Sequence, residues 1–248
     1  MKTKGHVILP DVSLCAIVRD EKMNPAGGIE RFVKSHVPFV EEAVIVDTGS
    51  LDGTREILEE LQGKYSNLNI YDTKFNGFAD ARNYSLSKVK TKYALVLDAD
   101  ELITHEKPSN DWEIINNGLK LEKERYTMKT VWIIPNGLKS SQEEAHLGRL
   151  GIAKKMRYIH SLFENLVQEN FSTKAYQLDF NINHFISSPE MVGKKEEEWY
   201  KQNLMDLRFG IVKRELFQNN IINKNIAPSQ IPGFTEWKSY NSQRDFYK

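Results

Sequence analysis

Apolar positions follow two different periodicities along roughly the first hundred residues. Continuous apolar runs at 12–18, 42–47, 68–71 and 93–97 predict buried strands. Between them, apolar residues recur at helical spacing over 28–37, 53–63 and 78–89. Strands that alternate with helices predict a parallel sheet with crossover helices, covered on both faces. In such a sheet, ligands bind beyond the carboxyl ends of the strands.

The pattern changes after residue 100. It predicts a short helix at 111–119, strands at 126–134 and 177–185, and a helix at 194–207. The region between the two strands has no clear periodicity, and the final thirty residues are rich in Asn, Gln and aromatic residues. The predicted fold class is therefore α/β, a Rossmann-like and mostly parallel sheet flanked by helices, with a helical and irregular C-terminal extension over 189–248.

Composition narrows the function classes. Lys and Arg total 34, as do Asp and Glu, and this net charge of zero argues against a nucleic-acid binder held by its overall field. Cys15 is the single cysteine, so an internal disulfide and a cysteine-built zinc site are excluded. No apolar run approaches the roughly 20 residues of a membrane span, and residues 1–10 lack the apolar stretch of a signal peptide. We expect a cytoplasmic protein without a transmembrane segment.

The strongest chemical signal is the sequence Asp98-Ala99-Asp100-Glu101, directly after the strand predicted at 93–97. Side chains two apart at a strand end point the same way, so Asp98 and Asp100 could present two carboxylates to one ligand. Hard oxygen ligands suit a Mg²⁺ or Mn²⁺ ion that carries a diphosphate. The alternative is a polar strand end that leads into a helix cap.

A second signal is the segment DTGSLDGT at 47–54, after the second strand. Its glycines permit a tight turn and close approach of a ligand, and Asp47 could accept a hydrogen bond from a base or a ribose. Ser50 or Asp52 could equally be the N-cap of the next helix. The segment matches neither an EF-hand loop nor a phosphate-binding P-loop.

A third signal is the segment FADARN at 78–83, where the third predicted helix begins. A helix N-terminus together with Arg82 suits a phosphate group. The alternative is that Arg82 pairs with an acidic residue on the surface.

Together, the segments VSLCAIVRDE, VIVDTGSLDGT, FADARN and LVLDADE resemble a family 2 glycosyltransferase of the GT-A fold. The resemblance is closest to the bacterial branch that contains lipopolysaccharide-core transferases and peptide S-glycosyltransferases. It covers residues 12–105 and continues through Gly148-Arg149-Leu150, Phe163-Glu164 and His184. It implies a GT-A domain over 1–188, with a nucleotide-binding half at about 10–105 and an acceptor half at about 106–188.

The resemblance implies an inverting, metal-dependent transfer from a nucleotide-sugar, usually a UDP-sugar, to a glycan, lipid-linked or peptide acceptor. It leaves peripheral membrane contact and a homo-oligomer open. On this sequence, the residues implied to frame or read the nucleotide are Ala16, Val18, Arg19, Glu21, Asp47, Ser50, Arg82 and, on the ribose side, Asp98. The residues implied to hold Mn²⁺ or Mg²⁺ are Asp100, with Asp98 beside it and His184 from a later strand.

The general base is the least defined part of the implied site. The related branch carries a His-Glu pair where this sequence has Phe163-Glu164, so the histidine is replaced. Glu164 is then the acid that matches the pair, and we expect it to be the base. His160 lies nearby and is the alternative base, because its ordinary pKa suits the task. A lone histidine can equally be structural.

Two other functions compete with that of a glycosyltransferase. A haloacid-dehalogenase-type phosphatase would place its paired aspartates on the first strand, with Thr or Val at the position of Leu102, whereas here three strand–helix units precede the motif. A nucleotide-sugar-binding protein on a catalytically decayed glycosyltransferase scaffold is the other alternative. The retained Asp47, Arg82, Asp98 and Asp100 argue against decay.

Overall fold

The computed structural model describes residues 9–103, 110–133, 139–159 and 165–185 of the 248-residue chain. The strands are β1 (Leu9–Val18), β2 (Val40–Asp47), β3 (Leu68–Asp72), β4 (Tyr93–Val96), β5 (Glu101–Leu102), β6 (Arg125–Ile133), β7 (Lys139–Ile152), β8 (Tyr158–Ile159), β9 (Asn165–Leu166) and β10 (Tyr176–Phe185). The helices are α1 (Gly28–His36), α2 (Thr54–Lys64), α3 (Phe78–Ser87) and α4 (Asp111–Leu119), with short 3-10 turns at Val37–Phe39, Ala153–Lys155 and Gln168–Asn170. The predicted helix at 194–207 and the extension at 189–248 lie outside the described residues.

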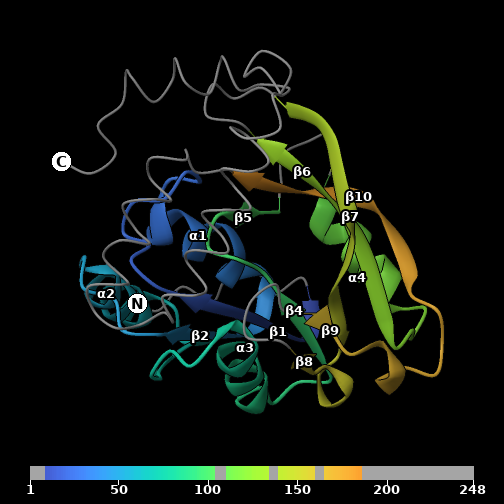
Figure 1. The fold of residues 1–248 in the computed structure, drawn as a ribbon, viewed down its shortest axis with the longest axis horizontal. Helices are drawn as coiled ribbons and strands as arrows, with labels where there is room; N and C mark the ends of the chain where they lie inside the picture. Colours follow the sequence, from blue (N-terminus) through green and yellow to red (C-terminus); the bar gives the residue numbers. More distant parts are fainter. Residues whose placement is uncertain (1–8, 104–109, 134–138, 160–164, 186–248) are drawn as a thin grey trace, which may run out of the picture.

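Within the described residues, one sheet of eight strands organises the fold, in the order β3-β2-β1-β4-β7-β6-β10-β5 (Figure 1). The strands β3, β2, β1 and β4 are parallel, as the alternating pattern predicts. The long strand β7 runs antiparallel to both β4 and β6, and β10 runs parallel to β6. The predicted α/β class with a helix-flanked sheet is confirmed, and β7 and the short β5, β8 and β9 are strands that the sequence pattern missed.

Alternate side chains of the central strands enter two separate cores, one on each face of the sheet. Leu14 of β1, Ile45 of β2 and Leu95 of β4 pack in the core that also holds side chains of α1, α2 and α4. Their neighbours in the sequence, such as Cys15 and Val44, pack in the core that includes residues of α3 and of the β8–β9 pair. Continuous apolar strands are therefore required, because both faces of each strand are buried.

The end of β10 lies beside the segment that follows β4. His184 pairs with Glu101 in the short antiparallel ladder between β10 and β5, and the Phe185 N–H donates to the Asp100 carbonyl at 2.9 Å. These backbone contacts fix residues 98–101 against a strand that comes more than eighty positions later in the chain. The polar residues after β4 and those at the end of β10 therefore share one edge of the fold.

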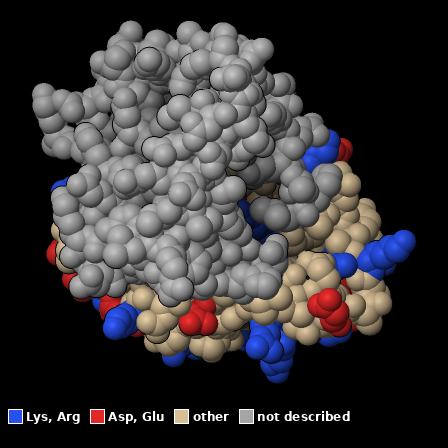
Figure 2. Space-filling model, in the orientation of Figure 1, with Lys and Arg blue, Asp and Glu red and all other residues tan. Residues whose placement is uncertain are grey.

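The described surface carries mixed charge. In the face shown in Figure 2, basic and acidic side chains are interspersed over the described part, which matches the net charge of zero. Among the described residues, no helix combines the length and the apolar character needed to cross a bilayer.

The loop between β1 and α1 depends on a glycine. Gly28 has φ of +86°, and a Cβ added there would lie 2.3 Å from the carbonyl oxygen of Lys22. A non-glycine residue in this backbone region costs about 1–2 kcal/mol before any steric clash. The loop can therefore close onto the start of α1 only with glycine at this position.

We expect Gly28→Ala to lower the free energy of unfolding by about 2 kcal/mol or more, because the backbone strain and the clash with the Lys22 carbonyl add. Gly63→Ala is the matched control. Gly63 lies in α2, where an added Cβ meets nothing within 4 Å, so we expect a gain of about 0.5–1 kcal/mol. Urea unfolding of both variants measures the difference, and equal stabilities would contradict the assignment.

Candidate functional site

The candidate site lies where the parallel strands end. Val18 at the end of β1 is in register with Asp47 at the end of β2, and Cys15 is in register with Val96 at the end of β4. The carboxyl ends of these three adjacent strands therefore meet at one edge of the sheet. The loops that follow them carry the three polar motifs of the sequence, as expected for a sheet of this type.

The loops after β1 and β2 are tied together by reciprocal hydrogen bonds. These are Asp20 N–H to Ser50 Oγ (2.9 Å), Glu21 N–H to Thr54 Oγ1 (2.7 Å), Lys22 N–H to Asp52 Oδ2 (2.9 Å) and Leu51 N–H to Asp20 Oδ1 (2.8 Å). The N-cap of α2 is Gly53, so neither Ser50 nor Asp52 takes the N-cap position that the sequence left open. Ser50 instead holds the loop after β1 in place.

Asp47 leaves one carboxylate oxygen available to a ligand. Its Oδ1 accepts the N–H groups of Gly49 at 2.6 Å and Ser50 at 2.7 Å. Its Oδ2 is buried and bonds to none of the described residues. An unsatisfied buried acceptor costs roughly 1–3 kcal/mol, and more when charged. A ligand with an N–H or O–H donor would remove that penalty, which fits the predicted contact with a base or a ribose.

Arg19 borders the same loop. It donates from Nη1 to the Thr48 carbonyl, and the guanidinium lies so close to Gly49 that a Cβ there would meet Nη1 at 2.9 Å. Ala16 and Val18, also implied to frame the base, have their side chains in the core. The Val18 carbonyl accepts from the backbone and the hydroxyl of Thr48. A role for these residues in nucleotide binding stays a prediction.

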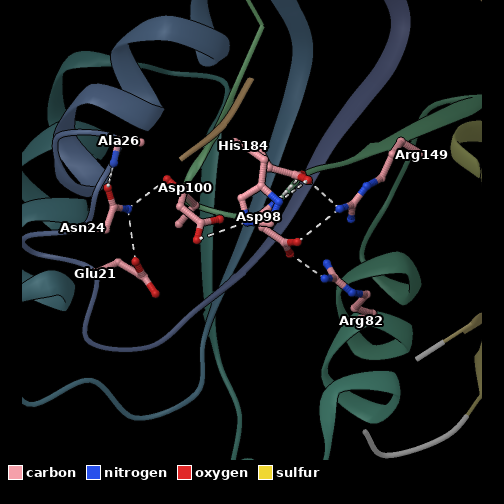
Figure 3. Close-up of polar contacts among 10 residues, drawn as sticks. Glu21, Asn24, Ala26, Arg82, Asp98, Asp100, Arg149 and His184 are labelled. Atoms are coloured by element: carbon pink, nitrogen blue, oxygen red, sulfur yellow. Dashed lines mark hydrogen bonds and ion pairs between the residues drawn. The ribbon is translucent and has the colours of Figure 1, made fainter. Parts of the chain in front are cut away.

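Asp98 lies between two arginines (Figure 3). Arg82 of α3 donates to its Oδ1 at 2.5 Å, and Arg149 of β7 donates to its Oδ2 at 3.2 Å. Arg82 thus pairs with an acid of the site instead of a surface acid. Burial penalises the charge on Asp98, but the two guanidinium groups outweigh it and hold the pKa of this carboxyl well below its usual range.

Glu101 completes this network from a fully buried position. Its Oε1 accepts from Arg149 Nη2 at 2.5 Å, and its Oε2 accepts the Asp98 N–H at 2.9 Å. Burial, with the nearby Asp98, outweighs the attraction to Arg149 and raises the pKa of Glu101 to about 7. Glu101 and Arg149 are residues of the site to which the sequence assigned no role. The signals were present in the motif at 98–101 and in the segment Gly148-Arg149-Leu150.

Asp100 faces His184 rather than the arginines. His184 Nε2 lies 3.7 Å from Asp100 Oδ2, and its Nδ1 lies 4.0 Å from Glu101 Oε1. Burial opposes charge on the imidazole, but the carboxylates of Asp100 and Glu101 outweigh it and raise the pKa of His184 to about 9. The strand pairing of β10 with β5 brings these two predicted residues together.

The two aspartates of the motif, expected to point the same way, have different ion-pair partners, and both carboxylates lie near enough to His184 to raise its pKa. The expectation assumed that the strand continues through residue 100, whereas β4 ends at Val96 and a turn follows, closed by a hydrogen bond from Glu101 N–H to the Asp98 carbonyl at 3.0 Å. The alternation of an extended strand does not apply in a turn. Asp98 therefore turns to Arg82 and Arg149, and Asp100 turns to His184.

The described residues were tested for a fit to a divalent ion. Across 9–103, 110–133, 139–159 and 165–185, no group of three or more His, Cys, Asp or Glu side chains is placed to hold a metal. Both oxygens of Asp98 are occupied by arginines, which leaves the Asp100–His184 pair. The Asp100 carboxylate suits a Mg²⁺ or Mn²⁺ ion whose other ligands are phosphate oxygens and water, whereas an imidazole is a more usual ligand for softer cations.

The implied base lies in another part of the chain. Glu164 and His160 both fall in the segment 160–164, outside the described residues. The described strands β8 and β9 flank this segment, and Asn83 of α3 bonds both the N–H and the carbonyl of Tyr158 at 2.8 Å. Their assignment as base candidates stays a prediction.

Comparison with known proteins gives matches over parts of the chain. A TPR repeat-containing protein of Synechococcus elongatus is 38% identical over 93 residues, which is 38% of this chain and 21% of that protein. A cholesterol galactosyltransferase of Borreliella burgdorferi is 33% identical over 63 residues, which is 25% of this chain and 18% of that protein. The matched part thus spans about a fifth of the length of each of these relatives.

Solved structures give a weaker likeness. S. aureus TarS 1–349 in complex with UDP-GlcNAc has a TM-score of 0.49 at 18% identity, over 71% of this chain and 59% of that one. The mannosyltransferase PcManGT of Pyrobaculum calidifontis, in complex with GDP-Man and Mn²⁺, has a TM-score of 0.38 at 20% identity, over 51% of this chain and 39% of that one.

The family model described as "Glycosyl transferase family 2" matches residues 24–117, the stretch from the loop after β1 to α4. This stretch contains Asp47, Arg82, Asp98 and Asp100, the residues that the structure places at the ends of β2 and β4 and on α3. This match agrees with the resemblance found in the sequence over the same stretch. Over residues 24–117 the chain is thus similar to glycosyl transferase family 2, and its described part folds as a helix-flanked mixed sheet.

Proposed function

We propose that this protein is an inverting glycosyltransferase that moves a sugar from a UDP-sugar to a glycan, lipid-linked or peptide acceptor with the help of Mn²⁺ or Mg²⁺. One observation carries the proposal: two kinds of polar group lie at the same edge of the sheet. They are a buried, unpartnered carboxylate oxygen on Asp47 and the cluster of Arg82, Asp98, Asp100 and His184. A hydrogen-bond acceptor for a base and cationic groups for a diphosphate are the two needs of a nucleotide-sugar.

The proposed placement of the donor follows the chemistry of these groups. Asp47 Oδ2 accepts an N–H of the base, and Arg82 and Arg149 face the negative charge of the diphosphate while Asp98 holds their guanidinium groups. Asp100 and His184 are the residues that would hold the ion, which supplies positive charge to the leaving diphosphate when bound. This arrangement is supported by the shared edge of the parallel strands, since Asp47 ends β2, Arg82 lies in the helix after β3, and Asp98 and Asp100 follow β4.

The proposed reaction is a single displacement. The acceptor atom forms a bond to the anomeric carbon as the bond from that carbon to the diphosphate oxygen breaks, and the electron pair leaves with UDP. The proton of the acceptor passes to a general base, for which we propose Glu164, with His160 as the alternative.

We also propose that residues 1–188 form the GT-A domain, that residues 189–248 form the extension, and that the protein works in the cytoplasm.

The proposed ion makes binding of UDP dependent on metal. We expect Mn²⁺ to tighten UDP binding to the wild-type protein by about tenfold or more, because the ion bridges the diphosphate to Asp100. Asp100→Asn should lose most of that increment, since an amide is a poorer ligand for a hard cation. The control is Glu59→Gln, because the exposed side chain of Glu59 on α2 pairs with Arg55. Calorimetric titration of UDP with and without MnCl₂ measures the difference. If the Kd of UDP for the wild-type protein is the same with and without Mn²⁺, the proposed metal site is wrong.

The proposed contact of Asp47 with the nucleobase can be tested in a variant that keeps the hydrogen bonds of the loop after β2. Asp47→Asn keeps an oxygen that can accept from Gly49 and Ser50 but replaces the free carboxylate oxygen with an amide. A charge-assisted hydrogen bond is worth about 1.5–3 kcal/mol, so we expect the Kd values of UDP and uridine to rise by about tenfold or more. If both UDP and uridine bind this variant as tightly as the wild type, Asp47 is a turn residue and does not read the base.

The assignment of Glu164 as the general base is tested by measuring turnover. General-base assistance is worth about 10²–10⁴-fold, so Glu164→Gln should slow sugar transfer by that factor with little change in UDP affinity. The assay begins with a screen of nucleotide-sugars for hydrolysis in the presence of Mn²⁺. If Glu164→Gln keeps wild-type turnover and His160→Ala loses it, His160 is the base. Binding of UDP with no turnover of any donor would favour the nucleotide-sugar-binding alternative.

A further inference from the structure

Asn24 is a buried amide that touches two loops of the site at once. It lies in the loop after β1, with 4% of its surface exposed. Its Oδ1 accepts the N–H groups of Ala26 at 3.0 Å and Gly28 at 2.8 Å, which closes its own loop onto the start of α1. Its Nδ2 donates to Glu21 Oε2 at 3.0 Å and to the Ala99 carbonyl at 2.9 Å. The amide therefore uses both donors and both acceptor positions.

The hydrogen bond from Asn24 to the Ala99 carbonyl is the one that leaves the loop after β1. Ala99 separates Asp98 from Asp100, so its carbonyl belongs to the turn that aims both carboxylates. Figure 3 shows Asn24 approaching this turn from the side opposite Arg82 and Arg149. The turn is thus held from two directions: by guanidinium groups on the Asp98 side and by a neutral amide from the loop after β1.

The same loop is bound to the loop that carries Asp47. The hydrogen bonds from Asp20, Glu21 and Lys22 to side chains of 50–54 leave the two loops as one unit. Direct contacts therefore connect three segments in series: the loop of Asp47, the loop after β1, and the turn of Asp98 and Asp100. The Asn24 side chain makes the contact between the loop after β1 and the loop after β4.

We propose that Asn24 is a positioning residue that sets the Asp98–Asp100 turn relative to the base-binding loops, so that one nucleoside diphosphate meets both. The inference rests on the proposed function for its ligand. Asn24 touches no part of the donor in this scheme. It acts by holding the Ala99 carbonyl, and its loss affects the diphosphate side of the site more than the base side.

The structure offers a sharp variant. Asn24→Asp keeps oxygens that can accept from Ala26 and Gly28, but it replaces the donor to Ala99 with an acceptor and faces the Glu21 carboxylate with a like charge. Asn24→Ala removes the same donor without adding charge, and it also removes the oxygen that accepts from Ala26 and Gly28. Asn67→Asp is the matched control, because Asn67 Nδ2 likewise donates to two backbone carbonyls, of Val37 and Val40 at 2.9 Å, in a loop that is not part of the site.

The first measurement is hydrogen exchange of the free protein. We expect the backbone amides of residues 98–101, including the Glu101 N–H that closes the turn, to exchange about tenfold faster in both Asn24 variants than in the wild type. Asn67→Asp should leave exchange in this segment unchanged. This measurement needs no ligand, so it tests the tie itself independently of the proposed function. Unchanged exchange in both Asn24 variants overturns the inference.

The second measurement is the ratio of UDP affinity to uridine affinity in the presence of Mn²⁺. In both Asn24 variants, we expect UDP to bind about tenfold more weakly and uridine to bind within about twofold of the wild type. Asn67→Asp should keep the wild-type ratio, because a general loss of stability weakens both ligands alike. A wild-type ratio in Asn24→Ala overturns the inference, since the effect of Asn24→Asp would then be one of charge. A wild-type protein that binds no UDP overturns the proposed function, and the ligand part of this inference with it.

Discussion

The ion pair of Arg149 with Glu101 is the interaction on which the rest of the site depends. Both groups lie inside the protein, and each would be costly there alone, because removing one partner of a buried pair typically costs about 3–5 kcal/mol. Glu101 uses its second oxygen to hold the Asp98 N–H, and Arg149 uses its guanidinium to hold the Asp98 side chain. The position of Asp98 is therefore set by its backbone and its side chain together.

Charge balance around this turn also bears on the proposed metal ion. Two guanidinium groups face the carboxylates of Asp98 and Glu101, and Asp100 faces an imidazole whose pKa is raised to about 9. The cluster is thus close to neutral before any ligand arrives, and a diphosphate adds negative charge that it does not compensate. A divalent ion would supply that compensation, and it would displace the proton of His184, because a metal-bound imidazole must be neutral.

The sequence predicted the fold of residues 10–105, the half proposed to bind the nucleotide, better than the rest for a physical reason. Strands buried on both faces, such as β1 and β2, must be apolar throughout, and the helices between them must carry one apolar stripe. The strand β7 lacks such a signature because its segment SSQEEAH is polar, and β5, β8 and β9 are two residues long. Pairing with β4 and β6 makes β7 a strand, pairing with β10 makes β5 one, and β8 and β9 pair with each other. Pairing between separate segments leaves no local pattern in the sequence.

The same limit explains which site residues were found. Asp47, Arg82, Asp98 and Asp100 lie next to the elements that position them, so a strand followed by a polar motif was enough to select them. The partners of Asp98 and Asp100 come from β7 and β10, and the tie to Ala99 comes from Asn24 in a loop seventy-five positions earlier. A motif therefore identifies the groups that meet a ligand, whereas the groups that aim them are set by strand order. The partners of each aspartate come from elements distant in the chain, and this is why a strand-end rule selected Asp98 and Asp100 but could not give their ion-pair partners.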